Sequence, residues 1–150
     1  MNLHYGTSTD IEPWMALVTR VRGNFPGLET AEALEDHKNT VLKFMQRSEA
    51  LCMKDGENIA GVLLFSSGHS MICCLAVAPE YRRQGAAAAM LQEVLSKLDR
   101  SREISVSTFR ENDPWGTAPR ALYKKFGFVE DELCIEFGYP CQKFILKSDC

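Results

Sequence analysis

One stretch of the chain, residues 75–91, constrains the fold more than any other. It begins as the end of an apolar strand, breaks at Pro79 and crosses a polar turn that carries Arg82 and Arg83. It then enters a helix whose first turn holds Gly85 and a run of alanines. The free backbone N–H groups of a helix start, together with the positive end of the helix dipole, favour phosphate binding. The stretch therefore predicts a strand–turn–helix unit with an anion site at the turn.

Small residues at the start of this helix fit that interpretation, because a larger side chain at Gly85 or Ala87 would keep a pyrophosphate away from the backbone. The sequence is not a P-loop, since the G-x-x-x-x-G-K-[ST] pattern is absent. It also lacks the three glycines of a dinucleotide-binding fingerprint. On this motif alone, a helix that uses its alanines only to pack on a sheet stays an alternative.

The rest of the hydrophobic pattern predicts a mixed sheet with helices on its faces. Apolar residues at helical spacing predict helices at about 10–22, 30–47, 86–98 and 117–126. Apolar runs bounded by turn residues predict strands at about 2–6, 50–53, 59–65, 70–77, 104–109, 128–136 and 142–147. We expect the 70–77 strand, the longest apolar run, to be central and buried on both faces. The order β-α-α-β-β-β-α-β-α-β-β indicates a single α/β (α+β) domain over residues 1–150.

Composition argues against several functional classes. The formal charge of −3 is unlike that of a general nucleic-acid binder, which carries a basic face. No apolar run reaches the length of a membrane span, and the N-terminus lacks the features of a signal peptide. The six cysteines form no C-x-x-C pair and no metal-finger spacing, so we expect free thiols and no metal. We therefore expect a cytoplasmic protein with neither nucleic acid nor membrane as a partner.

A second motif covers residues 121–128. Taken alone, it is a short helix that ends at Gly127, a residue type typical of the position after a helix C-terminus. Tyr123 on this helix would ordinarily be a packing residue with its hydroxyl at the rim of the core.

Together, at this spacing, the two motifs resemble those of the GNAT acetyltransferase superfamily. The family pattern is [QR]-x-x-G-x-[GA] after the fourth strand and L-Y-x-x-x-G-F at the end of a later helix. The chain carries Arg82-x-x-Gly85-x-Ala87 and Leu122-Tyr123-x-x-x-Gly127-Phe128. The resemblance extends over nearly the whole chain. It implies a mostly antiparallel sheet of six to seven strands with helices on both faces.

The resemblance implies acetyl-coenzyme A as the co-substrate. In such proteins the fourth strand bulges and splays from the fifth, and pantetheine lies along the open strand edge. The donor-binding residues implied in this way are Leu75, Ala76 and Val77 at the strand edge, and Arg82, Arg83, Gln84, Gly85, Ala86 and Ala87 at the phosphates. The amide of Leu75 or Val77 would polarise the thioester carbonyl. Lys124 and Lys125 are further candidates for the outer phosphates.

Tyr123 matches the general acid of the family, which protonates the leaving thiolate. A phenol with a pKa of about 10 holds its proton at neutral pH, which suits that role. Many members place an asparagine seven residues earlier, where this chain has Gly116; Asn112 is a candidate replacement at the donor site. The general base stays open among His37, His69, Glu80, Asp113 and a chain of water molecules.

The expected activity is N-acetylation of a primary amine by direct attack in a ternary complex, because no clear nucleophile is present. An acyl carrier role for Cys73 or Cys74 is a weaker alternative. A non-catalytic acyl-coenzyme A sensor and a purely structural interaction domain are two further alternatives.

The acceptor stays open between a peptide amine and a small-molecule amine. Candidate selectivity residues are Trp14, Arg22, Phe25, Pro26 and Leu28 near the first two helices, with the loop at Trp115 and the turn at 137–140 on the other side. For each aromatic residue among them, packing in the core is the favoured alternative. Pairing of the closing strands across a homodimer is also left open.

Overall fold

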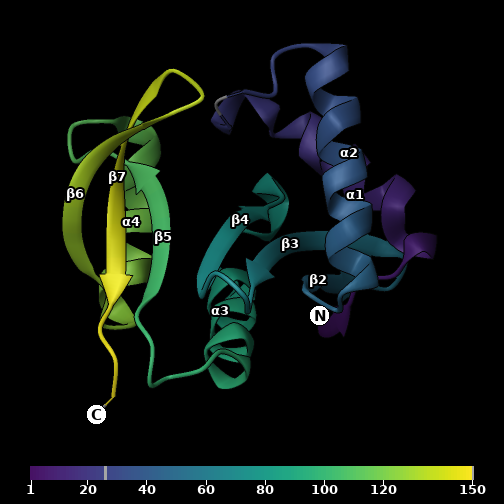
Figure 1. Ribbon diagram of the computed structural model, residues 1–150. Coiled ribbons are helices and arrows are strands. Elements are labelled where there is room, and N and C mark those ends of the chain that lie inside the picture. Colours follow the sequence, from purple (N-terminus) through teal and green to yellow (C-terminus); the bar gives the residue numbers. More distant parts are fainter. Residues whose placement is uncertain (26, 150) are drawn as a thin grey trace.

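The computed structural model describes residues 1–25 and 27–149, so Pro26 and Cys150 lie outside the described residues. The described chain forms a seven-stranded sheet in the order β1-β2-β3-β4-β5-β7-β6 (Figure 1). Of its pairs, β4–β5 alone is parallel among the described strands, and this confirms the mixed, mostly antiparallel sheet. The strands are β1 (Asn2–Tyr5), β2 (Ala50–Asp55), β3 (Asn58–Ser66), β4 (Met71–Val77), β5 (Ile104–Phe109), β6 (Val129–Glu136) and β7 (Tyr139–Leu146).

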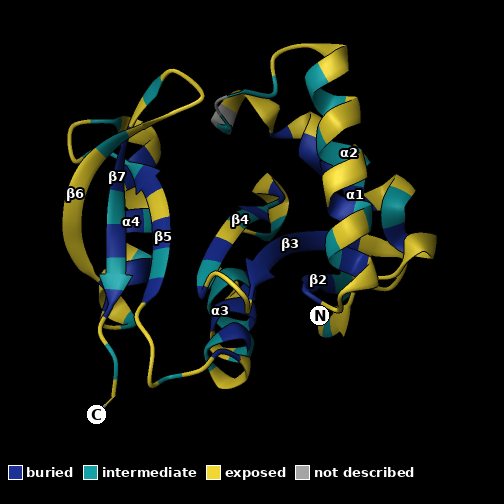
Figure 2. Cartoon of the chain, viewed as in Figure 1, coloured by how far each residue is buried: buried dark blue, intermediate teal, exposed yellow. Residues whose placement is uncertain are grey.

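Helices cover both faces of the sheet, as the continuous apolar run along β3 requires. Leu63 of β3 packs in a core with α3 and α4, whereas Val62 packs in a second core with α1 and α2. Figure 2 shows β3 buried along its length. The helices are α1 (Ile11–Arg20), α2 (Ala31–Gln46), α3 (Ala86–Lys97) and α4 (Thr117–Lys125), with short 3-10 turns η1 (Ser8–Asp10), η2 (Arg22–Asn24), η3 (Pro79–Tyr81) and η4 (Pro114–Gly116).

The prediction that the 70–77 strand is buried on both faces is wrong. β4 is central, yet Cys73 is exposed and Leu75 and Val77 are only half-buried. The reason is that β5 pairs only with the first two residues of β4, Met71 and Ile72, after which the two strands separate. Cys73 is an extra, bulged residue, because Ile72 and Cys74 pair with consecutive residues of β3. The expected bulge and splay of this strand are thereby confirmed.

The structure confirms the predicted ends of two helices but places the start of the last strand earlier than predicted. Thr30 caps α2 by accepting a 3.0 Å hydrogen bond from the Ala33 amide. Gly127 ends α4 with φ +95°, as predicted. β7 begins at Tyr139, earlier than the predicted residue 142, because Phe137 and Gly138 both have positive φ and form a two-residue hairpin turn. No helix in the described part of the chain is long and apolar enough to cross a bilayer.

Candidate active site

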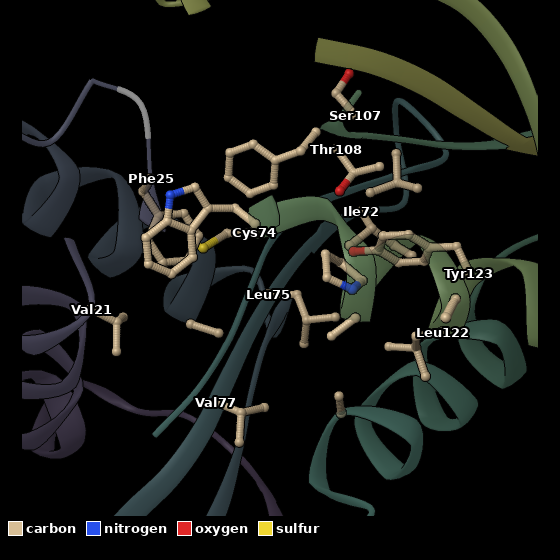
Figure 3. A pocket seen from close by; sticks show the side chains of 18 of the residues that line it. Val21, Phe25, Ile72, Cys74, Leu75, Val77, Ser107, Thr108, Leu122 and Tyr123 are labelled. Atoms are coloured by element: carbon tan, nitrogen blue, oxygen red, sulfur yellow. The ribbon is translucent and has the colours of Figure 1, made fainter. Parts of the chain in front are cut away.

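A cavity of about 1080 Å³ fills the gap between β4 and β5. Figure 3 shows Leu75 and Val77 of β4 on one side of it and Leu122 and Tyr123 of α4 on the other. The cavity exists because the two strands separate after Ile72, so one edge of β4 has no strand partner in the described chain. Backbone N–H and C=O groups on such an edge are free to pair with an extended ligand.

The start of α3 closes one end of this cavity with small residues and backbone amides. Arg83 and Gly85 adopt left-handed φ values of +64° and +83°. The amide of Ala89 donates to the Gly85 carbonyl at 2.9 Å, so the amides of the first helical turn have no partner within the helix. A Cβ built on Gly85 would meet no atom within 4 Å, which shows that the space beside this turn is open. This end is therefore suited to an anion that approaches the backbone closely.

Most of the residues predicted to bind the acetyl donor line this cavity, whereas Gln84, Asn112, Lys124 and Lys125 do not. Gln84 is outside the lining, and its side chain donates a 3.1 Å hydrogen bond to the Glu80 carbonyl. Asn112 is exposed on the loop after β5 and is outside the lining as well. The predicted residues that do line the cavity are Leu75, Ala76, Val77, Arg82, Arg83, Gly85, Ala86, Ala87 and Tyr123.

Tyr123 is buried, and its ring packs between Phe128 and Phe144 at centroid distances of 5.6 and 6.2 Å. Its side chain nevertheless reaches the cavity (Figure 3). Burial raises the pKa of the phenol above its ordinary value of 10.0, with a smaller contribution from the nearby Cys74 thiol. The hydroxyl therefore keeps its proton at neutral and mildly alkaline pH, which suits a proton donor.

None of the four residues weighed as a general base lines the cavity. His69 is exposed in the turn before β4, and burial lowers the pKa of His37 on α2. Glu80 accepts two hydrogen bonds from Arg20, at 2.9 and 2.8 Å, and these lower its pKa to about 2. Asp113 accepts hydrogen bonds from the Tyr139 hydroxyl and the Trp115 amide, so its carboxylate is already engaged.

Glu136 is a cavity residue that sequence reasoning missed. It is the last residue of β6, and it contributes the one carboxylate among the described lining residues. The hydroxyl of Ser107 on β5 donates to its Oε1 at 3.3 Å. No spacing rule connects Glu136 to β4, because strand pairing across β7 brings it to the cavity. Its place before a tight turn was the only local signal.

The two thiols weighed as acyl carriers, Cys73 and Cys74, line the cavity, whereas the two lysines weighed for phosphate binding do not. Although Cys73 is exposed as a residue, desolvation of the two thiols raises their pKa values to about 11 and about 12. They are therefore protonated and weak nucleophiles, which disfavours an acyl carrier role. Lys124 and Lys125 lie outside the lining, and Lys124 pairs with Glu130 at 2.8 Å. In the described ranges, no group of three or more His, Cys, Asp or Glu residues is arranged to hold a metal ion.

The residues expected to select the acceptor also separate into two groups. Trp14 is fully buried in the α1–α2 core, so of its two candidate roles, core packing and substrate contact, the structure supports core packing. Leu28 packs against the same core. Phe25 lines the cavity, and Arg22 lines a smaller adjoining one of about 120 Å³. Pro26 lies outside the described residues.

Comparison with known proteins supports the resemblance. Residues 46–130 match the family model described as an acetyltransferase (GNAT) domain. No curated protein matches the chain significantly.

Among solved structures, the chain is similar to a GNAT-family acetyltransferase from Bacillus cereus, with 19% identity, a TM-score of 0.75 and coverage of 99% of this chain and 98% of that one. It is similar to an N-acetyltransferase from Staphylococcus aureus, with 16% identity, a TM-score of 0.76 and coverage of 97% and 100%. It is also similar to the ribosomal-protein-S18-alanine N-acetyltransferase from Escherichia coli, with 17% identity, a TM-score of 0.72 and coverage of 99% and 95%.

Proposed function

The chain belongs to the GNAT acetyltransferase family, and on that premise we propose that it transfers the acetyl group of acetyl-coenzyme A to a primary amine. One observation carries the proposal. A single cavity joins the unpaired edge of β4, the amide-rich start of α3 and the phenol of Tyr123. These are the features needed to hold an extended donor, to bind its phosphates and to supply a proton.

The cavity residues fit the chemistry of the donor. The pantetheine arm carries two amides, and the free edge of β4 at Leu75–Val77 offers the backbone groups that pair with amides. The pyrophosphate fits the amides at Gly85–Ala87, where the helix dipole favours negative charge. Arg82 and Arg83 line the same end and add positive charge. Gln84 and Asn112 stay predictions for donor binding, from positions outside the lining.

The chemistry proceeds by direct attack. The amine nitrogen forms a bond to the thioester carbonyl carbon, the carbon–sulfur bond breaks, and the sulfur leaves as a thiolate. Tyr123 gives its proton to that sulfur, and the proton lost by the amine departs through water, from which Tyr123 recovers one. The amide of Leu75 or Val77 stabilises the negative charge that develops on the carbonyl oxygen.

The proposal also covers the domain organisation of the chain and its cellular compartment. We propose that the chain is a single acetyltransferase domain, since β1 and β7 belong to one sheet. We also propose that it works in the cytoplasm, where the free thiols at Cys52, Cys73, Cys74, Cys134 and Cys141 stay reduced.

The proposal is tested by calorimetric titration with acetyl-coenzyme A, followed by coenzyme A release with a panel of primary amines. We expect saturable donor binding, a higher melting temperature with the donor present, and release that depends on the amine. Donor binding without release for any amine would support the non-catalytic sensor instead. Absence of donor binding would overturn both ideas and leave a structural interaction domain.

A further inference from the structure

The residues that line the cavity come from both faces of the sheet. Ala86–Ala88 and Tyr123 belong to the helices that cover the face with the α3–α4 core. Val21 and Phe25 line the cavity from the α1–α2 side. Ser107 alternates along β5 with Val106, which packs in the α3–α4 core, so Ser107 points to the α1–α2 face. The donor side of the cavity therefore lies on the α3–α4 face of the sheet, and the α1–α2 face is left for the acceptor.

The acceptor side of the cavity is aromatic. Phe25, Phe109, Trp115 and Phe137 all line it. Trp115 is 52% exposed and Phe137 is 81% exposed, which is unusual for rings of this size without a binding partner. The adjoining small cavity shares Phe25, Phe109 and Trp115 and adds Tyr139, so the aromatic lining continues outward.

The charge of the lining differs between the two sides. Its cations are Arg82 and Arg83 at the donor side, and its carboxylate is Glu136 at the acceptor side, counted over the described lining residues. Ser107 donates to Glu136 at 3.3 Å. Arg110 steadies the hairpin that carries Glu136, because it donates to the carbonyls of Cys134 and Cys141, both at 3.1 Å. Within the large cavity, the acceptor side thus presents one carboxylate among aromatic rings, and the adjoining small cavity adds Arg22 and Glu29.

The mouth on this side is narrowed by a contact between two distant segments. A Cβ built on Gly27 would lie 2.8 Å from Cγ of Phe137, so the ring rests against the backbone of the α1–α2 connection. Figure 1 shows the β6–β7 turn reaching toward that connection. A peptide acceptor would have to continue outward past this contact, whereas a small amine fits behind it.

We propose that the acceptor is a small amine with a single positive charge and an apolar or aromatic body. Its ammonium group lies beside Glu136 before it loses its proton, and its body packs against Phe25, Phe109, Trp115 and Phe137. Cation–π attraction to these rings adds to the attraction of Glu136. Polyamines and aminoglycosides carry several charges, whereas the large cavity offers one carboxylate and the adjoining small cavity adds Glu29 together with the cation Arg22. Most of their charges would therefore lack a carboxylate partner. The proposal rests on the function proposed above, since it names the acceptor of the same site.

The test compares phenylethylamine with methylamine, spermidine, an aminoglycoside and a tripeptide that begins with phenylalanine. We expect phenylethylamine to have the highest kcat/KM. Binding is also followed without turnover, through tryptophan fluorescence in the presence of coenzyme A. Trp14 is fully buried in the core, so an amine at the proposed site changes the emission of Trp115.

Two substitutions separate the charge from the rings. Glu136→Gln should raise the KM of phenylethylamine about tenfold, the loss expected for one charge-assisted contact. Glu132→Gln, on the same strand but outside the lining, is the matched control and should leave the KM of phenylethylamine unchanged. Phe137→Asn removes a ring while keeping a residue that tolerates the left-handed φ of +52° at this turn. Phe137→Asn should lower the affinity for phenylethylamine more than the affinity for methylamine.

The outcomes distinguish this proposal from the proposed function. Preferred transfer to spermidine, the aminoglycoside or the peptide would keep an acetyltransferase and overturn the proposed acceptor class. Equal KM values for Glu136→Gln and Glu132→Gln would overturn the role of Glu136. If no amine is acetylated but fluorescence still reports phenylethylamine binding that Glu136→Gln weakens, the recognition site stands and the proposed activity fails.

Discussion

Arg120 donates a 2.8 Å hydrogen bond from Nη1 to Oε1 of Gln142, and both side chains are buried. The same nitrogen donates to the Phe109 carbonyl at 3.0 Å, and the guanidinium lies 4.8 Å from the ring centroid of Phe144. Arg120 therefore attaches α4 to β5 and β7, on the side of the cavity opposite β4. Tyr123 is three residues further along α4, on the same face of the helix, so this attachment also fixes the phenol.

Arg120→Met should destabilise the fold by about 2–3 kcal/mol, because it removes the donor to the buried Gln142 side-chain oxygen and to the partly buried Phe109 carbonyl. Lys124→Met is the matched control. Lys124 shares the partner Glu130, but its side chain is exposed, and such a surface pair contributes about 0–1 kcal/mol. Urea unfolding of both variants measures the difference, and equal losses would show that Arg120 does not anchor α4.

Tyr123→Phe should lower kcat about a hundredfold or more, the scale of a lost general acid, and leave the affinity for acetyl-coenzyme A unchanged. The fold should tolerate the change, since phenylalanine keeps the ring that packs against Phe128 and Phe144. Steady-state kinetics and donor titration measure the two effects. An unchanged kcat would remove Tyr123 from the mechanism.

The raised pKa of Tyr123 also predicts the alkaline side of the pH–rate profile. Burial disfavours the phenolate, so the pKa of the phenol lies above 10.0 and the proton donor persists at higher pH than a free phenol would. The kcat should therefore not fall between pH 8 and about pH 10 through loss of this proton. A fall in kcat near pH 9, absent in Tyr123→Phe, would contradict the raised value.

Gly85→Ala separates backbone strain from donor binding. Gly85 has φ +83°, and a new Cβ there meets nothing within 4 Å, so the cost to stability should be only the strain of about 1 kcal/mol. Gly56→Ala is the matched control, with φ +61°, equally open space and a position outside the cavity. Both variants should lose similar stability in thermal melts. Only Gly85→Ala should lower the affinity for acetyl-coenzyme A, by about tenfold, because its methyl group occupies the proposed pyrophosphate position.

Glu49 should make the fold sensitive to acid. Burial alone would raise the pKa of this carboxyl, but hydrogen bonds from Ser67 and Arg47 outweigh it, so the pKa lies below the ordinary 4.5. A lowered folded-state pKa gives stability that is complete above pH 4.5 and is lost as the pH falls through the lowered value. In urea unfolding below pH 5, the free energy of unfolding of Glu49→Gln should depend less on pH than that of the native chain. Glu57→Gln, at an exposed position, should show the same pH dependence as the native chain. Parallel acid profiles for both variants would contradict this role.

The donor side of the cavity was predictable because its information is local. Gly85 and the following alanines are consecutive in the chain, and the L-Y-x-x-x-G-F motif lies within one helix. Helix caps such as Thr30 depend on the next few residues, so their signals also survive without tertiary structure. The start of β7 was misplaced because Phe137 takes a left-handed φ that its residue type does not suggest.

The amino-acid sequence by itself determined the order of elements, the small-residue turn before α3 and the helix that carries Tyr123. Tertiary structure alone decided where β4 and β5 separate, because the bulge at Cys73 depends on its pairing with β3. It also decided that Glu136, and not a residue near β4, supplies the carboxylate of the cavity. Side chains far apart in the chain meet only through the register of β6 with β7 and of β7 with β5, and local propensity does not encode that register.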